Sequence, residues 1–568
     1  MISKQFKRRI LLPLALSVLL VSAVFAIPAK PGIWQKFSIK SGGSVNVSLV
    51  GDEHYHFWID SLGNRYSLNN DMQLVPYVSI MKVPRRLPTE SIEGEEHYAG
   101  FPKNPSIFRG KKKGLIILAA FSDKDFAEAD PQATFYNIAN ARHYSEGKFK
   151  KSVRDYFLEQ SDSLFDLSFD VVGPVKLAHG FAYYGANDEN GSDLRPGEMV
   201  AEACKLVDAE VDYHDYDWDD DGEVDQIFVI YPGYGESEGA PSTTIWPHEW
   251  TLSSAIGSTL TLDGMTIDTY ACGNELSGIS GKNLNGIGTI CHEFSHCMGF
   301  PDFYDKYNFG MGAWDVMANG SRNGNGFNPA EYTAYERMIC GWRQPIELKG
   351  DMDVTNLKPI DDGGETYIMY CDNPARTEYY LFENKNKSDI YPYNYSGHGL
   401  LVTHVDYSPE LWYYDVPNST ATYYRDDRTM GYNTHQRMTI LAADNRTTAR
   451  GGYITDVFPI NNNSTYEDLD SLSGYGSPCF TQYLGGDTAQ ILTGRKLSEI
   501  TRDDAGLVSF HFSGPLTTSV KNISVANTSS TEPKEYFSLS GVCYAQPQKG
   551  LNIVKLKNGS VLKVYVKN

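Results

Sequence analysis

One stretch of eleven residues holds the residue types that a catalytic zinc site needs. It reads His292-Glu293-Phe294-Ser295-His296-Cys297-Met298-Gly299-Phe300-Pro301-Asp302. Histidines four positions apart lie on one face of a helix, so His292 and His296 can bind the same zinc ion. Glu293 is placed to take a proton from a zinc-bound water and to deliver it to a leaving amine. The spacing therefore predicts hydrolysis at a zinc centre, with Glu293 as the catalytic residue.

The third zinc ligand has two candidates beyond this helix. Gly299 is predicted to end the helix in the left-handed conformation, and Pro301 stiffens the returning chain. Asp302 then lies where a third ligand would be presented, and aspartate binds zinc at about the same distance as histidine. Asp305, a little further on, competes for this role. We expect Asp302 as the ligand and keep Asp305 as the alternative.

A methionine follows in the stretch Trp314-Asp315-Val316-Met317-Ala318. It resembles the Met-turn of the metzincin class of zinc peptidases, in which a methionine lies beneath the metal. We expect Met317 to form a hydrophobic floor under the two imidazoles. In isolation, the same methionine would be read as an ordinary core residue.

Together these residues resemble the M6 family of secreted metallopeptidases, the immune inhibitor A group. The resemblance covers about residues 110–515 and is carried by His292–Asp302 with Phe303-Tyr304-Asp305, Trp314–Met317, Asp217–Asp225, Ile245–His248, Phe382–Asn384 and Gly397–Asp406. It implies a secreted zinc-dependent endopeptidase that is made with a propeptide and hydrolyses extracellular proteins. One position departs from some metzincins, because Asn319 stands where they have a tyrosine; no tyrosine is therefore assigned to stabilise an oxyanion.

An acidic stretch predicts a structural calcium site. Alternating carboxylates converge on a hard cation, and Gly222 permits the sharp turn between them. The twelfth position of the loop, which is glutamate in an EF-hand, is Phe228, so a switching EF-hand is not expected. A solvated acidic turn is the alternative. The candidate Ca²⁺ ligands are Asp217, Asp219, Asp221, Glu223 and Asp225.

The composition narrows the possible partners. The 568 residues include 71 acidic and 50 basic side chains, which gives a net charge of −21. No basic surface is available for nucleic acid, and the negative charge suits a secreted, soluble protein. The content of 38 tyrosines and 51 glycines favours β-rich, turn-rich structure. We expect a monomer that acts on protein or peptide substrates.

The N-terminus predicts a secretory signal peptide over residues 1–26. Basic residues before Ile10 precede the apolar stretch Ile10–Phe25, and Val24 and Ala26 are small enough for cleavage after Ala26. An uncleaved anchor helix is the alternative. No other segment is long and apolar enough to span a membrane, so we expect no transmembrane helix after cleavage and a secreted or cell-surface location.

The rest of the chain predicts an α+β protein with four further parts. Residues 27–110 form a β-rich propeptide, and residues 111–345 form a metzincin-like mixed α/β zinc peptidase domain. Residues 346–515 form an all-β, sandwich-like domain, and residues 516–568 form a linker and a small β module. The individual segments predicted as strands or helices are 44–50, 114–121, 152–160, 164–172, 197–211, 226–231, 378–382, 399–405, 551–556 and 561–566.

Three features leave more than one interpretation open. Residues 85–114 are predicted as a loop whose basic residues, Arg85-Arg86 and Lys111-Lys112-Lys113, serve as maturation sites or belong to an ordinary linker with solvated charges. The tail resembles the C-terminal sorting module of type IX secretion substrates, which implies secretion machinery as a partner; a β module without an export role is the alternative. Among the eight cysteines, Cys291 and Cys297 flank the zinc helix and are expected to be small core residues or halves of disulfides.

No cysteine lies between residues 27 and 203, so the propeptide cannot inhibit through a cysteine ligand. A propeptide carboxylate at the open zinc position would serve instead. Two other functions fit parts of the sequence. One is a surface-binding or adhesion protein that uses the peptidase domain as a scaffold, and the other is a zinc hydrolase of non-peptide substrates.

Overall fold

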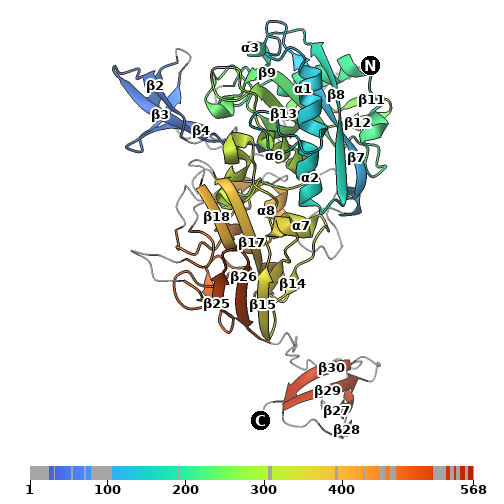
Figure 1. The fold of residues 1–568 in the computed structure, drawn as a ribbon, viewed down its shortest axis with the longest axis vertical. Helices are drawn as coiled ribbons and strands as arrows, with labels where there is room; N and C mark the ends of the chain where they lie inside the picture. Colours follow the sequence, from blue (N-terminus) through green and yellow to red (C-terminus); the bar gives the residue numbers. More distant parts are fainter. Residues whose placement is uncertain are drawn as a thin grey trace, which may run out of the picture. The chain divides into compact units, whose positions relative to one another are not determined.

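The computed structural model divides into two compact units, residues 1–348 with 353–512 and residues 349–352 with 513–568 (Figure 1). The signal peptide predicted over residues 1–26 lies almost entirely outside the described residues, because residues 1–24 are not among them. The described residues are 25–515 except 31, 53–55, 70–71, 78–104, 189–190, 305–309, 391–394, 426–428, 447–454 and 461–468, together with 533–537, 543–544, 546, 550–556 and 561–566.

A six-stranded sheet organises the region that holds the predicted zinc helix. Its order is β1-β10-β13-β9-β7-β8. The four strands β13, β9, β7 and β8 run parallel, whereas β10 and β1 are antiparallel to their neighbours at one edge. The strands are β1 (Phe25–Ala26), β7 (Gly110–Ala120), β8 (Phe165–Lys176), β9 (Ile227–Tyr234), β10 (His248–Thr251) and β13 (Thr269–Leu276).

Both faces of this sheet are buried, which explains the continuous apolar runs in the sequence. Ile116 and Leu118 of β7 share one hydrophobic cluster with α1, α2 and α6, while Leu115 and Ile117 share another with α4. Figure 1 shows α1 and α2 lying along the sheet. The helices are α1 (Pro131–Asn140), α2 (Val153–Gln160), α4 (Pro196–Val207) and α6 (Ile287–Cys297).

The strong local patterns of this region are confirmed. The helix predicted at 152–160 forms as α2, and Ser152 caps it by accepting a hydrogen bond from the Asp155 amide at 3.0 Å. The loop prediction for 85–114 is wrong at its end, because β7 already begins at Gly110. There Lys113 pairs with Asp170 and Asp215 at 3.2 and 2.8 Å, so partners from neighbouring elements hold the basic residues in a strand.

The remaining elements of this region are short. They are α3 (Phe181–Tyr184), α5 (Leu252–Ala255), β11 (Leu260–Leu262), β12 (Met265–Ile267), α7 (Ala334–Ile339) and the 3₁₀ turns Pro105–Phe108, Tyr213–Tyr216, Glu236–Glu238, Gly312–Trp314 and Asn319–Gly326.

Ahead of β7, an antiparallel sheet forms the N-terminal β module. Its strands follow each other in chain order, β2-β3-β4-β5-β6. Val47, Leu49 and Trp58 of this module share a buried cluster with Trp246, which belongs to the segment leading into β10. The module is therefore packed against the edge of the six-stranded sheet. Its strands are β2 (Trp34–Ser38), β3 (Ser44–Gly51), β4 (His56–Asp60), β5 (Arg65–Leu68) and β6 (Leu74–Pro76).

The region after residue 345 is built mainly of strands. One sheet has the order β14-β16-β17-β18-β21 and a second has the order β15-β26-β25-β22. The predicted strands at 378–382 and 399–405 lie within β17 and β18, and α8 (Pro409–Tyr413) interrupts the strands. The chain as a whole is therefore an α+β protein, as the sequence predicts. The strands are β14 (Ile346–Glu347), β15 (Asp351–Leu357), β16 (Tyr367–Tyr370), β17 (Glu378–Ile390), β18 (Tyr395–Asp406), β19 (Thr422–Tyr424), β20 (Met430–Tyr432), β21 (Met438–Ile440), β22 (Leu472–Ser473), β23 (Thr481–Gln482), β24 (Gln490–Ile491), β25 (Lys496–Arg502) and β26 (Val508–Ser513), with a 3₁₀ turn at Ile360–Asp362.

The second unit contains an antiparallel sheet in the order β28-β27-β29-β30. The strands predicted at 551–556 and 561–566 are confirmed there. The strands are β27 (Pro533–Phe537), β28 (Cys543–Tyr544), β29 (Gly550–Leu556) and β30 (Val561–Val566).

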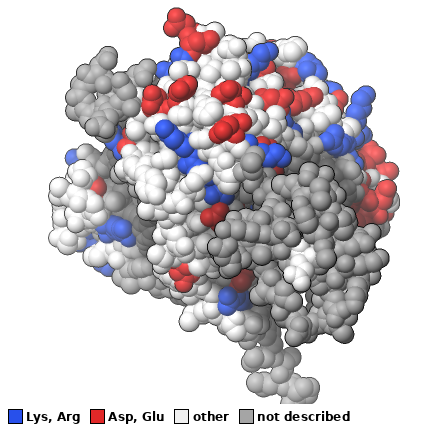
Figure 2. Space-filling view, turned by 90° about the horizontal axis from the view of Figure 1, so that it is seen from below, with Lys and Arg blue, Asp and Glu red and all other residues white. Residues whose placement is uncertain are grey.

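Surface charge and helix length bear on the possible partners. On the face drawn in Figure 2, lysine and arginine side chains lie among aspartate and glutamate side chains and do not gather into one basic patch of the described residues. Within the described part of the chain, no helix is long and apolar enough to cross a membrane.

Buried charges join β17 to the segment that leads into α7. Lys387 donates from Nζ to Glu331 Oε1 at 2.8 Å and to the Pro329 carbonyl at 2.7 Å. Lys385 donates to the Tyr332 carbonyl at 3.1 Å. Burial alone would raise the pKa of Glu331, but the ammonium groups of Lys387 and Lys385 lower that pKa to about 2.

Replacement of Lys387 by alanine leaves Glu331 without its nearest cation, so we expect a loss of about 3–5 kcal/mol in the free energy of unfolding at pH 7. Because the folded-state pKa of Glu331 is depressed from 4.5 to about 2, this stabilisation is present above pH 4.5 and is lost as the pH falls toward 2. Urea unfolding at several pH values measures both effects. The exposed Lys358→Ala is the control, and equal stability of Lys387→Ala and the wild type would contradict the assignment.

Candidate metal and catalytic site

Helix α6 carries the predicted zinc histidines and is fixed at both ends by close backbone contacts. At its start, a Cβ atom on Gly288 would lie 2.0 Å from the Ser321 carbonyl oxygen, so only glycine lets residues 319–326 approach. At its end, Gly299 has a φ of +96° and donates to the His296 carbonyl at 2.7 Å. The predicted left-handed turn at Gly299 is confirmed, and it returns the chain toward the helix.

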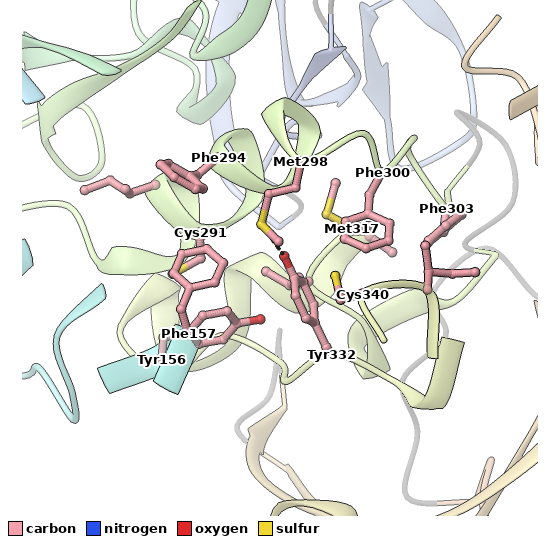
Figure 3. Packing of buried hydrophobic residues seen from close by; sticks show 14 of the residues in the cluster. Tyr156, Phe157, Cys291, Phe294, Met298, Phe300, Phe303, Met317, Tyr332 and Cys340 are labelled. Atoms are coloured by element: carbon pink, nitrogen blue, oxygen red, sulfur yellow. Dashed lines mark hydrogen bonds between the residues drawn. The ribbon is translucent and has the colours of Figure 1, made fainter. Parts of the chain in front are cut away.

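Apolar side chains support this turn from below. Figure 3 shows Met298, Phe300, Met317 and Phe303 packed together with Tyr332, whose hydroxyl donates to the Met298 sulfur at 3.7 Å. Met317 is fully buried, and its carbonyl accepts from the Phe303 amide at 2.8 Å. The methionine therefore lies in the floor beneath the end of α6.

The imidazole rings of the two histidines face each other, and the Nδ1 atom of each ring is hydrogen-bonded to a main-chain carbonyl. His292 Nδ1 lies 2.7 Å from the Val316 carbonyl, and His296 Nδ1 lies 2.7 Å from the Phe300 carbonyl. A carbonyl only accepts, so each Nδ1 carries the hydrogen and each Nε2 keeps a lone pair. The two Nε2 atoms are 3.2 Å apart.

Asp302 completes a triangle of donor atoms. Its Oδ1 lies 3.4 Å from His292 Nε2 and 3.5 Å from His296 Nε2. Tetrahedral ligands about 2.0–2.1 Å from a zinc ion are about 3.3–3.4 Å apart. The three separations of 3.2, 3.4 and 3.5 Å are close to that spacing. The donor set and its dimensions fit a zinc ion, and Asp305 lies outside the described residues.

Asp415 holds Asp302 in place, although no pattern in the sequence pointed to Asp415. Asp415 Oδ1 accepts from the Asp302 amide at 2.7 Å across 113 residues of sequence. Asp415 follows α8 and has a φ of +52°, which aspartate tolerates better than most residues. The region after residue 345 therefore supplies part of the site, and no local pattern could have revealed it.

Glu293 is buried beside the two histidines, and the three side chains form one group able to hold a metal ion. The Ile27 amide donates to Glu293 Oε1 at 2.8 Å. Ile27 belongs to the leading segment, residues 25–30, which enters as β1 and pairs with β10. The sequence suggested a propeptide carboxylate at the open zinc position as a means of inhibition. The contact that the structure shows at Glu293 comes instead from the main chain of Ile27.

Only some of the predicted calcium ligands in the acidic loop, residues 217–225, lie close to one another. Asp217, Asp219 and Asp225 form a group that could hold a metal ion, whereas Asp221 and Glu223 do not join it. Asp221 Oδ1 instead accepts from the Glu223 amide at 2.8 Å. Burial, with the charges of Asp219, Asp221 and Asp217, raises the pKa of Asp225 to about 7 despite a hydrogen bond from the Trp218 amide.

A further buried group, Cys371, Glu378 and His404, was not selected from the sequence. Glu378 accepts from His404 Nε2 and from the Tyr483 and Leu484 amides at 3.1, 2.6 and 2.8 Å, so its oxygens anchor the 483–484 turn.

The described cysteines do not pair with one another. Cys291 is buried and Cys297 is partly buried, and neither forms a disulfide within the described part of the chain, nor do the other five cysteines with described side chains. Burial raises the pKa of the Cys291 thiol well above its usual value. Of the two interpretations, the core role fits Cys291.

Known proteins share this region of the chain. Residues 111–344 match the family described as immune inhibitor A peptidase M6, catalytic domain. Immune inhibitor A of Bacillus thuringiensis subsp. alesti is 23% identical over 288 residues, which cover 42% of this chain and 42% of that protein. Pre-pro-metalloprotease PrtV of Vibrio cholerae serotype O1 is 25% identical over 217 residues, which cover 33% of this chain and 23% of that protein. The matches thus span less than half of either relative's length.

The fold, the donor triangle and these matches define a metallopeptidase domain. By this match, residues 111–344 are similar to the catalytic domains of the M6 family, the immune inhibitor A peptidases.

The Asp415 contact predicts an effect on metal affinity. Asp415→Gly removes the acceptor but tolerates the positive φ, so we expect zinc to bind about 10- to 100-fold more weakly. Asp415→Asn keeps an oxygen acceptor and should stay close to the wild type. Competition with a chromogenic chelator measures both affinities. Equal affinities of the two variants would show that the hydrogen bond to Asp302 does not matter.

Proposed function

We propose that the chain is a secreted zinc endopeptidase that hydrolyses peptide bonds of extracellular proteins. In this proposal His292, His296 and Asp302 hold the zinc ion, and Glu293 is the catalytic residue. The observation that carries it is the triangle of three donor atoms, 3.2 to 3.5 Å apart, with a buried carboxylate next to it.

The residues around the triangle have separate tasks. A bound zinc ion polarises a carbonyl and acidifies a water molecule. Glu293 takes a proton from the attacking water and passes it to the leaving nitrogen. The Val316 and Phe300 carbonyls hold the imidazoles in the tautomer that leaves both Nε2 atoms available. Met317 forms the Met-turn of a metzincin-like domain.

The other parts of the chain take the roles predicted from the sequence. Residues 1–26 are the signal peptide, 27–110 the propeptide, 111–345 the peptidase domain and 346–515 a sandwich-like β domain. Residues 516–568 form the module read by secretion machinery, and the enzyme is a monomer at the cell surface or released from it. The packing of the N-terminal β module on Trp246 supports the propeptide role.

The leading segment keeps the enzyme inactive until it is removed. It is buried over residues 27–30, and its Ile27 nitrogen lies 2.8 Å from the catalytic carboxylate. Cleavage after Ala26 would turn this amide into a terminal ammonium group, and its charge would hold Glu293 as an ion pair rather than as a base. The relative PrtV is itself named a pre-pro-metalloprotease.

A calcium ion is the proposed occupant of the acidic loop. Asp217, Asp219 and Asp225 would bind it, with Asp221 and Glu223 as further candidates. Burial, and then the charges of the neighbouring carboxylates, raise the pKa values of Asp219 and Asp225, and a bound cation would offset both effects.

Casein cleavage tests the proposed function. Protein freed of residues 27–110 should cleave casein, the uncleaved chain should not, and a zinc chelator should stop the reaction. Glu293→Gln should lower the rate about 10²- to 10⁴-fold while zinc remains bound, because it removes only the proton transfer.

Glu159→Gln, on the surface of α2, is the matched control. Cleavage that survives Glu293→Gln would refute the mechanism. Bound zinc without proteolysis would favour the adhesion scaffold, and hydrolysis of esters alone would favour a non-peptide substrate.

Calcium binding should raise the melting temperature. We expect about 1 mM Ca²⁺ to raise the Tm of the wild type relative to chelator-treated protein, because this concentration is similar to the dissociation constants of weak extracellular calcium sites. Asp217→Asn should abolish this rise, while Asp353→Asn, in β15, should leave it intact. Calorimetry with Mg²⁺ as a second control decides the point, and an unchanged wild-type Tm argues for the solvated turn.

A further inference from the structure

We infer that Arg322 is a substrate-positioning residue, which binds the main-chain carbonyl of the second residue after the scissile bond. The inference rests on the proposed peptidase function and deepens it. It comes from the leading segment, whose main chain stands in for a bound peptide in the catalytic cleft.

The Ala26–Ile27 peptide group lies where a scissile bond would lie. Glu293 must reach the nitrogen of the leaving amine, and its Oε1 is 2.8 Å from the Ile27 nitrogen. The residues before this bond form β1, which adds to the edge strand β10 in antiparallel register, Ala26 opposite His248. Addition of a strand to a sheet edge is a common way to bind an extended peptide.

Beyond that bond, the cleft holds the segment by its main chain. Trp246 Nε1 donates to the Ile27 carbonyl at 2.9 Å, and Arg322 Nη2 donates to the Pro28 carbonyl at 2.6 Å. The Lys30 amide donates to the Ser237 carbonyl at 2.7 Å. Every peptide offers such carbonyls, so the same donors can hold a substrate whatever its side chains.

Arg322 also has partners outside the segment, although Lys30 of the segment shares one of them, Glu238. Its Nη1 donates to Glu238 Oε1 at 3.3 Å, and its Nη2 donates to Ser237 Oγ at 3.2 Å. Glu238 in turn accepts from Ser277 Oγ at 3.2 Å and from the Gly278 amide. Arg322 is 3% exposed with the segment in place, and its contacts with Glu238 and Ser237, which lie outside the segment, are available to orient the guanidinium when the segment leaves.

Trp246 is less informative as a test position, because it also packs against the N-terminal β module. Arg322 contacts the segment through its guanidinium, and a hydrogen bond from a charged donor contributes more than one from a neutral donor. The carbonyl at the second position past the scissile bond therefore has a buried, pre-oriented charged donor.

Two fluorogenic peptides of different length test this role in the processed enzyme. The shorter ends as an amide one residue after the scissile bond, and the longer has one residue more, which adds the carbonyl that Arg322 would bind. In Arg322→Ala, kcat/KM for the longer peptide should fall about 10- to 100-fold, mainly through KM. The shorter peptide should change little.

The double variant Glu238→Gln/Arg322→Gln guards against misfolding of the processed enzyme, because Lys30, the other cation that pairs with Glu238, leaves with the segment and no charge of this group stays unpaired. Arg195→Gln is the matched control, since Arg195 also donates to a main-chain carbonyl, that of Tyr183, at 3.2 Å. An equal loss for both peptides would mean that Arg322 has only a structural role, and this would overturn the inference.

Hydrogen exchange in the uncleaved chain gives a readout that needs no activity. The amides of Ala29 and Lys30, bonded to the Gly51 and Ser237 carbonyls, should exchange faster in Arg322→Ala, which keeps the Lys30–Glu238 ion pair, and at the wild-type rate in Arg195→Gln. Unchanged exchange would overturn the inference. If the wild type cleaves neither peptide, the proposed function fails, while exchange still decides whether Arg322 holds this carbonyl.

Discussion

The site depends on two hydrogen bonds from histidine to the main chain. Each Nδ1 of His292 and His296 is held 2.7 Å from a carbonyl, and both carbonyls belong to segments that follow α6. One is at Phe300, just past the left-handed glycine, and the other is at Val316, next to Met317. The turn and the apolar floor are therefore what aim the two Nε2 atoms at one point, and the helix alone would leave both rings free to rotate.

The sequence predicted those parts of the site that lie close together along the chain. His292, Glu293 and His296 are fixed by helix periodicity, and Asp302 follows from the glycine turn. Asp415 could not be predicted, because it meets Asp302 across 113 residues and lies on a strained turn without a recognisable pattern. The contact of Ile27 with Glu293 spans 266 residues and could not be predicted for the same reason. Long-range packing determines both.

For the fold, too, local patterns could be predicted and features that depend on distant contacts could not. The apolar runs and the alternating strands were predicted within a few residues, because burial on one or both faces of a sheet imposes its own periodicity. The loop prediction for residues 110–114 is wrong, because three consecutive lysines conceal the start of β7, where Lys113 pairs with Asp170 and Asp215. Lys387, which pairs with the buried Glu331, likewise lies in a strand that its composition alone does not identify as core.

Strand β10 would otherwise be the edge of the six-stranded sheet. A strand edge with unpaired amides and carbonyls is a template on which other chains can stack, and proteins in the course of folding are most vulnerable to this. While β1 lies beside β10, that template is covered at Glu249 and His248. In the uncleaved chain β1 thus shields this edge from association with copies of the same protein, and removal of residues 25–26 leaves the edge open to an extended peptide.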